Sequence, residues 1–224
     1  MFTQPQSTPE PTTRPSPAPG AAAGLRCLAL GDSYTAGDIL AAGERLPAQL
    51  IRRLRAMGIN IEDPRVIAKA GWTTAELSSA VNAANLNGIF DLITLLTGVA
   101  NQYRGQPPDQ YREQFRALLY QAIEFAGGEE KRVLVVSLPD WGLTPFAKNF
   151  NHSLISEQID AYNQIIRAEA SQAGTRYVDI TAKSRLLVRQ DSMLASDELH
   201  PSGQQYAAWL ELIFPEALAA LGRY

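Results

Sequence analysis

The sequence predicts an α/β fold in which helices cover both faces of a five-stranded parallel β-sheet, as a three-layer α/β/α sandwich. Short apolar segments of strand length alternate with longer segments whose apolar residues recur at helical spacing. This alternation is typical of βαβ units, whose strands run parallel. Small, polar or aromatic residues follow four successive strand segments. Because ligands bind beyond the carboxyl ends of the strands in such sheets, we expect the functional site there.

The first elements follow from local patterns. Leu25–Leu30 is a short apolar run typical of a buried strand, and Leu46–Met57 has apolar residues at helical spacing and ends before a glycine. Arg65–Ala70 predicts a second strand. The segment Thr74–Ala84 predicts a helix whose N-cap is Thr73 or Thr74.

The second half of the chain continues the alternation. Phe90–Thr97 is the most apolar strand segment, so we place it at the centre of the sheet. Asp109–Phe125 is a strongly amphipathic helix closed by two glycines, and Arg132–Leu138 is the fourth strand. The last three elements are the helix Ile155–Ala173, the strand Tyr177–Ile180 and the helix Gly203–Leu221.

Composition separates a tail from one domain. Residues 1–24 are rich in Pro, Thr, Ser, Gln and Ala, which predicts a disordered tail or tether, and residues 25–224 form the domain. The net charge of −3 gives no basic excess for nucleic acid. No apolar run is long enough to cross a bilayer. The single cysteine, Cys27, excludes an intrachain disulfide and is expected to be buried.

Two histidines narrow the choice of a catalytic base. His152 lies in a polar loop without an acid at useful spacing, whereas His200 follows Asp197 by three residues. Acyl transfer needs a nucleophile, a base, a group that orients the base, and donors for the oxyanion. Ser33, directly after the first strand, is the candidate nucleophile for a site with His200 and Asp197. Its neighbour Asp32 is expected to be structural, because adjacent side chains at a strand end point apart.

From Leu25 to its C-terminus the sequence resembles the GDSL/SGNH hydrolase superfamily. The resemblance lies in Gly31-Asp32-Ser33-Tyr34, in Gly71, and in Asp197-x-x-His200. It implies a flavodoxin-like SGNH hydrolase fold and hydrolysis of small or short-chain acyl esters by a Ser33-His200-Asp197 triad, without cofactor or metal. It also implies an oxyanion hole that uses the backbone N–H groups of Ser33 and Gly71.

The third motif departs from the family pattern. It reads Gly98-Val99-Ala100-Asn101, so Ala100 stands where relatives have an oxyanion-hole asparagine. An engineered substitution is favoured because the other motifs are intact. The alternatives are a natural variant, in which Asn101 or Gln102 moves into the hole, and a loss of catalysis. We expect a weakened esterase, and a non-catalytic binding module or an acyltransferase on the same fold remain alternatives.

Residues beside these motifs are candidates for substrate contacts. The polar candidates are Asn101 and Gln102, and the aromatic ones are Trp72, Tyr103, Trp141 and Phe146, for which simple packing is the other interpretation. Arg104 would either meet an anionic substrate or be a surface charge. The expected partner is a small-molecule ester. The sequence leaves open the oligomeric state and the compartment, which is either the periplasm or the exterior with a signal removed, or the cytoplasm.

Overall fold

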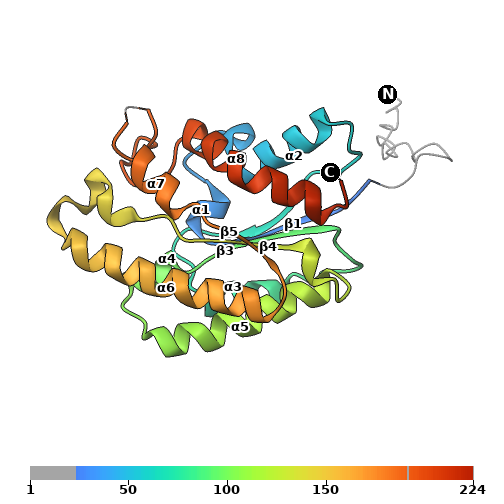
Figure 1. Ribbon diagram of the computed structural model, residues 1–224, viewed down its shortest axis with the longest axis horizontal. Coiled ribbons are helices and arrows are strands. Elements are labelled where there is room, and N and C mark those ends of the chain that lie inside the picture. Colours follow the sequence, from blue (N-terminus) through green and yellow to red (C-terminus); the bar gives the residue numbers. More distant parts are fainter. Residues whose placement is uncertain (1–23, 191, 224) are drawn as a thin grey trace, which may run out of the picture.

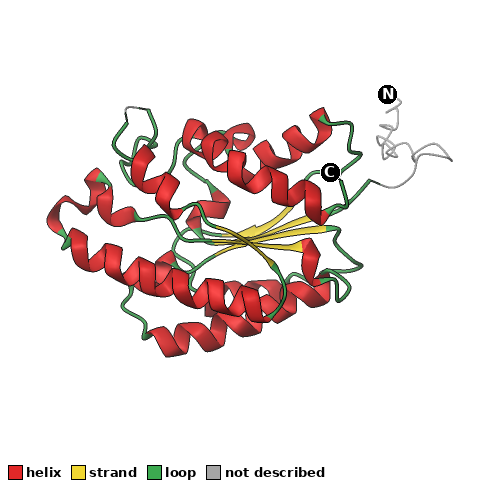
Figure 2. Cartoon of the chain, viewed as in Figure 1, coloured by secondary structure: helices red, strands yellow, loops and turns green. Residues whose placement is uncertain are grey.

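The fold is a five-stranded parallel sheet between two layers of helices, as a computed structural model that describes residues 24–190 and 192–223 shows (Figures 1 and 2). The strand order is β2-β1-β3-β4-β5, so β3 is central, as the sequence predicts. The strands are β1 Cys27–Gly31, β2 Arg65–Ala68, β3 Leu92–Leu96, β4 Val133–Val136 and β5 Arg176–Val178. The predicted tail, apart from Gly24, lies outside the described residues.

Each long helix expected from the sequence is present, with bounds that differ by a few residues. These helices are α2 Leu46–Ala56, α3 Thr74–Ala83, α5 Pro108–Phe125, α6 His152–Gln172 and α8 Gly203–Ala220. Helices α2 and α8 pack together on one face of the sheet, and α3, α5 and α6 cover the other (Figure 1). Thr73 caps α3 in a capping box with Glu76, which decides between the two candidate threonines.

Three short helices were not expected from the sequence: α1 Ser33–Ala36, α4 Val99–Tyr103 and α7 Thr181–Leu187. Two of them, α1 and α4, directly follow β1 and β3. These strands are neighbours from which the chain proceeds to opposite sides of the sheet, so their carboxyl ends form the switch point of the topology. The fold therefore brings the turns after β1 and β3 together.

The core lies on both sides of the sheet. Strands β1 and β4 are buried along their whole length, and Tyr111 and Phe115 of α5 are fully buried. Cys27 is part of this core, and burial raises the pKa of its thiol to about 12, so it is unreactive at neutral pH. Among the described residues, no helix combines the length and apolar character that a membrane span requires.

Candidate active site

Ser33 begins α1 immediately after β1, in a turn with no spare room. A Cβ atom at position 31 would clash with the Leu96 carbonyl oxygen, so only glycine fits there. Asp32 caps α1 by accepting the backbone N–H of Tyr34 at 3.1 Å. The serine side chain is half-buried at the carboxyl end of the sheet.

Asp32 holds two turns together. Besides Tyr34, its carboxylate accepts the backbone N–H of Gly98 at 3.2 Å, which joins the turn after β1 to the turn after β3. Burial raises the pKa of Asp32 to about 6, although hydrogen bonds from the backbone of Tyr34, Gly98 and Val99 oppose the shift. These contacts agree with a structural role for Asp32.

Asp197 and His200 form a short, well-defined pair. One carboxylate oxygen lies 2.5 Å from His200 Nδ1, and the other accepts the backbone N–H groups of Leu199 at 3.1 Å and His200 at 3.0 Å. Partial burial raises the pKa of Asp197, but the hydrogen bonds from His200 and Leu199 outweigh it and hold that pKa below its ordinary value. Asp197 is therefore ionised at neutral pH and fixes the orientation of the His200 ring.

The loop that carries this pair is locally strained and well anchored. Glu198 adopts a left-handed conformation with φ of 58°, which is uncommon outside glycine and concentrates at functional sites. The backbone of His200 is held through its carbonyl, which accepts the N–H of Ala195 at 2.8 Å. The His200 ring packs against Tyr34, with ring centroids 5.1 Å apart.

One cavity of about 400 Å³ brings most of the predicted site together. Its walls contain Ser33, Tyr34, Ala70, Gly71, Val99, Ala100, Tyr103, Arg104, Trp141, Phe146, Leu199 and His200. The nucleophile and base candidates thus share a largely apolar hollow. Within the described part of the chain, no hydrogen bond joins the Ser33 hydroxyl to the His200 ring; such catalytic contacts are often loose until substrate binds.

Gly71 and Ala100, which the sequence predicts at an oxyanion hole, both line the cavity. Gly71 has φ of 79° and is the third residue of a turn closed by the Trp72 N–H and the Lys69 carbonyl, where glycine is favoured. The backbone N–H groups of Ser33 and Gly71 donate to no other described residue. Ala100 presents only a methyl group to the cavity.

The sequence predicts that Asn101 and Gln102 contact the substrate, but both are buried and neither lines the cavity. Asn101 is fully buried; its amide accepts the backbone N–H of Thr74 and donates to the Thr74 hydroxyl and to Gln106. Gln102 is also buried, donating to Gln158 at 2.8 Å and accepting the Trp141 indole N–H at 2.6 Å. Both amides are committed to the scaffold, so neither takes the place of a donor at Ala100.

The aromatic candidates separate into two groups. Trp72 is half-buried and packs against the core, and it is not among the residues that line the cavity. Tyr103, Trp141 and Phe146 do line it. With Phe150 they form a cluster whose ring centroids are 5.3 to 6.2 Å apart, and three of these rings are substantially exposed.

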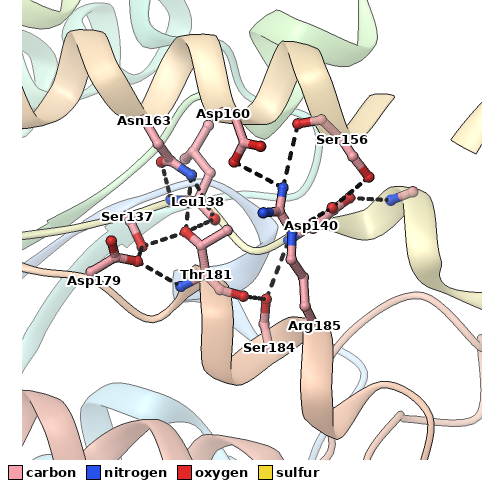
Figure 3. Close-up of polar contacts among 11 residues, drawn as sticks. Ser137, Leu138, Asp140, Ser156, Asp160, Asn163, Asp179, Thr181, Ser184 and Arg185 are labelled. Carbon is pink, nitrogen blue, oxygen red and sulfur yellow. Dashed lines mark hydrogen bonds and ion pairs between the residues drawn. The ribbon is translucent and has the colours of Figure 1, made fainter. Parts of the chain in front are cut away.

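A polar network fixes the turn that carries Trp141 (Figure 3). Asp140 is buried and follows β4. Its carboxylate accepts hydrogen bonds from the Ser156 hydroxyl at 2.6 Å and from the Arg185 guanidinium at 2.8 Å. Arg185, from α7, also pairs with Asp160 on α6 at 2.8 Å. Sequence patterns did not indicate this network, or the places of Tyr34 and Leu199 in the cavity wall. Pro139-Asp140-Trp141 at a strand end was the available signal, but its partners lie on helices far along the chain.

Comparisons with known proteins identify the family and the fold. The sequence profile of the GDSL-like lipase/acylhydrolase family matches residues 29–208. No curated protein matches the chain. Solved structures share the fold: TesA (19% identity, TM-score 0.70, covering 88% of this chain and 99% of that one) and a lipase/acylhydrolase from Enterococcus faecalis (22%, 0.66, 86% and 94%). Axe2, an acetylxylan esterase from Geobacillus stearothermophilus, is similar at 17% identity and a TM-score of 0.63, covering 90% and 97%.

Proposed function

The chain belongs to the GDSL-like lipase/acylhydrolase family, and we propose that it hydrolyses carboxylic esters with Ser33 as nucleophile, His200 as base and Asp197 as the orienting acid. One observation carries this proposal most strongly. Asp197 holds Nδ1 of His200 at 2.5 Å, and His200 and Ser33 line the same cavity. A nucleophile and an oriented base facing one hollow are the requirements for acyl transfer.

The mechanism follows from these positions. Because the Asp197 carboxylate accepts a hydrogen bond from Nδ1–H of His200, Nε2 is left unprotonated as the acceptor for the Ser33 proton. The Ser33 oxygen attacks the ester carbonyl, and the backbone N–H groups of Ser33 and Gly71 stabilise the oxyanion. His200 then donates its proton to the leaving alcohol, and water releases the acyl group by the reverse route.

The cavity favours small esters. Its volume of about 400 Å³ lies toward the lower end of the range of roughly 300–1,000 Å³ for small-molecule sites. Apolar and aromatic side chains form most of its wall, which suits an apolar acyl chain better than a polar one. We therefore propose small or short-chain acyl esters as substrates.

Turnover should be slower than in an enzyme whose oxyanion hole has all of its donors. Ala100 offers no side-chain donor, and the amides of Asn101 and Gln102 are engaged elsewhere. Loss of one such donor typically costs about 10²–10³-fold in kcat. We expect slow but measurable hydrolysis.

Hydrolysis of p-nitrophenyl esters from acetate to decanoate tests the proposal, with Ser33→Ala as the matched variant. Activity that is highest for the short esters and is lost in Ser33→Ala supports it. Equal activity in the two proteins would exclude Ser33 as nucleophile. Absence of activity together with tight binding of an ester analogue would indicate a binding module, and a product found only on an added sugar acceptor would indicate an acyltransferase.

A further inference from the structure

Arg104 is the one permanently cationic side chain among the residues that line the cavity. Its Nη2 donates to the carbonyl oxygen of Gly71 at 2.6 Å, and its Nη1 pairs with Glu76 at 3.1 Å. The guanidinium therefore lies beside the glycine whose backbone N–H faces the proposed oxyanion. The sequence alone left Arg104 between an anion-binding residue and a surface charge.

Helical geometry brings Arg104 to this place. Arg104 caps the C-terminus of α4 and follows Ala100 by four residues, so the two side chains project from the same face of the helix. Both line the cavity. A methyl group at position 100 offers no donor, so Tyr103 and Arg104 are the residues of this helix end that line the cavity and can donate. Of the two, Arg104 is the one that contacts Gly71.

The acceptors of Arg104 are themselves fixed. Glu76 accepts the backbone N–H of Thr73 at 2.8 Å and the Thr73 hydroxyl at 2.9 Å. These hydrogen bonds, together with the charge of Arg104, keep the pKa of Glu76 below its ordinary value, so the partner of Arg104 is an anion at neutral pH. Arg104 thus connects the end of α4 to the Gly71 turn and to the start of α3.

We propose that Arg104 is a positioning residue of the oxyanion hole, which holds the Gly71 turn and keeps a positive charge on the side of the cavity where Ala100 supplies no donor. This inference rests on the proposed esterase function. It differs from recruitment of an anionic substrate, because the Arg104 charge is already paired with Glu76 and the neighbouring cavity wall is apolar. Because Glu76 already pairs with the Arg104 charge, Arg104 acts mainly by fixing the Gly71 turn, whose N–H matters more to the oxyanion of the transition state than to the bound ester.

The test uses Arg104→Gln with Arg55→Gln as a matched control. Arg55 also donates to one backbone carbonyl, that of Ile61 at 2.9 Å, and pairs with one carboxylate, that of Asp63 at 2.9 Å. Its side chain is 46% exposed, against 51% for Arg104. Ile61 lies in a bridge with Leu25, which precedes β1, so Arg55 contacts the amino end of the sheet, whereas the cavity lies at its carboxyl end. The two substitutions therefore remove similar contacts at different distances from the site.

With p-nitrophenyl butyrate, Arg104→Gln should lower kcat by about 10–100-fold while KM changes less than about twofold. Arg104→Lys should recover part of that loss, and Arg55→Gln should leave kcat unchanged. The loss should shrink to a few-fold in an Ala100→Asn background, because the asparagine then supplies the missing donor.

Three results would overturn the inference. The first is equal kcat in Arg104→Gln and Arg55→Gln. The second is a loss of the same size with Ala100→Asn present, which would indicate a general structural role. The third is an effect confined to KM of an anionic ester such as p-nitrophenyl hemisuccinate, which would indicate ground-state recognition. In each case activity that still depends on Ser33 leaves the esterase function intact, whereas activity that survives in Ser33→Ala refutes that function instead.

Discussion

Replacement of Asp197 by asparagine should nearly abolish activity without unfolding the protein, and the local geometry gives the reason. Two backbone N–H groups, of Leu199 and His200, donate to one oxygen of Asp197, while Nδ1 of His200 contacts the other. An asparagine has one oxygen and one NH₂ group. Its oxygen must meet the two backbone donors, because the NH₂ group there would face two further N–H groups without an acceptor.

That orientation places the NH₂ group against Nδ1 of His200. The ring must then accept at Nδ1 and carry its proton on Nε2, so it cannot take the proton of Ser33. A triad forced into the wrong tautomer loses about 10⁴ in kcat, or roughly 5 kcal/mol at 1.4 kcal/mol per tenfold. The hydrogen bonds from the backbone survive, so the thermal stability should change little.

The assay measures kcat for steady-state hydrolysis of p-nitrophenyl butyrate at neutral pH, with Glu198→Gln as the control. Glu198 is an exposed acid in the same loop whose side chain forms no hydrogen bond or ion pair with the His200 ring among the described residues, so its neutralisation should leave kcat unchanged. Melting temperatures of both variants report on folding. An Asp197→Asn protein with kcat within tenfold of the wild type would refute the tautomer argument.

The other predictions concern the oxyanion hole and two buried acids. Ala100→Asn should raise kcat for p-nitrophenyl butyrate by up to about 10²–10³-fold, and an unchanged kcat would remove position 100 from the hole. Hydrogen bonds from Arg116 first, and then Arg112, keep the pKa of Glu169 below its ordinary 4.5. Glu169→Gln should therefore lower the unfolding free energy by about 2 kcal/mol at pH 7. This difference should shrink as the pH falls below 4.5; urea titrations that give the same difference at every pH would contradict it. Burial raises the pKa of Asp32 from 3.8 to about 6, so its ionisation should lower the unfolding free energy by roughly 3 kcal/mol as the pH rises from 4 to 6, at about 1.4 kcal/mol per pH unit. An NMR titration of the carboxyl group checks this, and a midpoint near 4 would contradict it.

The long elements of the fold were predictable because their signals are local. The amphipathic repeat of Pro108–Phe125, the capping box of Thr73 and Glu76, and the apolar run of β3 each lie within a few turns of chain. The short helices α1, α4 and α7 were not predictable in this way. Helices of four to seven residues are too short to show a period, and α1 depends on a cap by Asp32 that also requires a contact with Gly98.

Whether a site residue could be predicted depends on whether its partners are close in sequence. Asp197 and His200 are three residues apart, so their pairing is visible in the sequence. The direction of Asn101 and Gln102 depends on the rotation of α4, which turns positions 101 and 102 inward and positions 100, 103 and 104 toward the cavity. This spacing of three and four residues is one face of a helix, and it becomes informative only when α4 itself is known.

The most direct test of the central claim is covalent labelling of Ser33 by a fluorophosphonate, followed by peptide mass spectrometry. The reagent reacts with a serine that is activated by a neighbouring base, even where turnover is slow. We expect a single adduct on the peptide that contains Ser33 in the wild type, a much slower reaction in Asp197→Asn, and no adduct in Ser33→Ala. An unlabelled wild-type protein that is folded, or an adduct on another residue, would contradict the assignment of Ser33, His200 and Asp197 as the catalytic machinery.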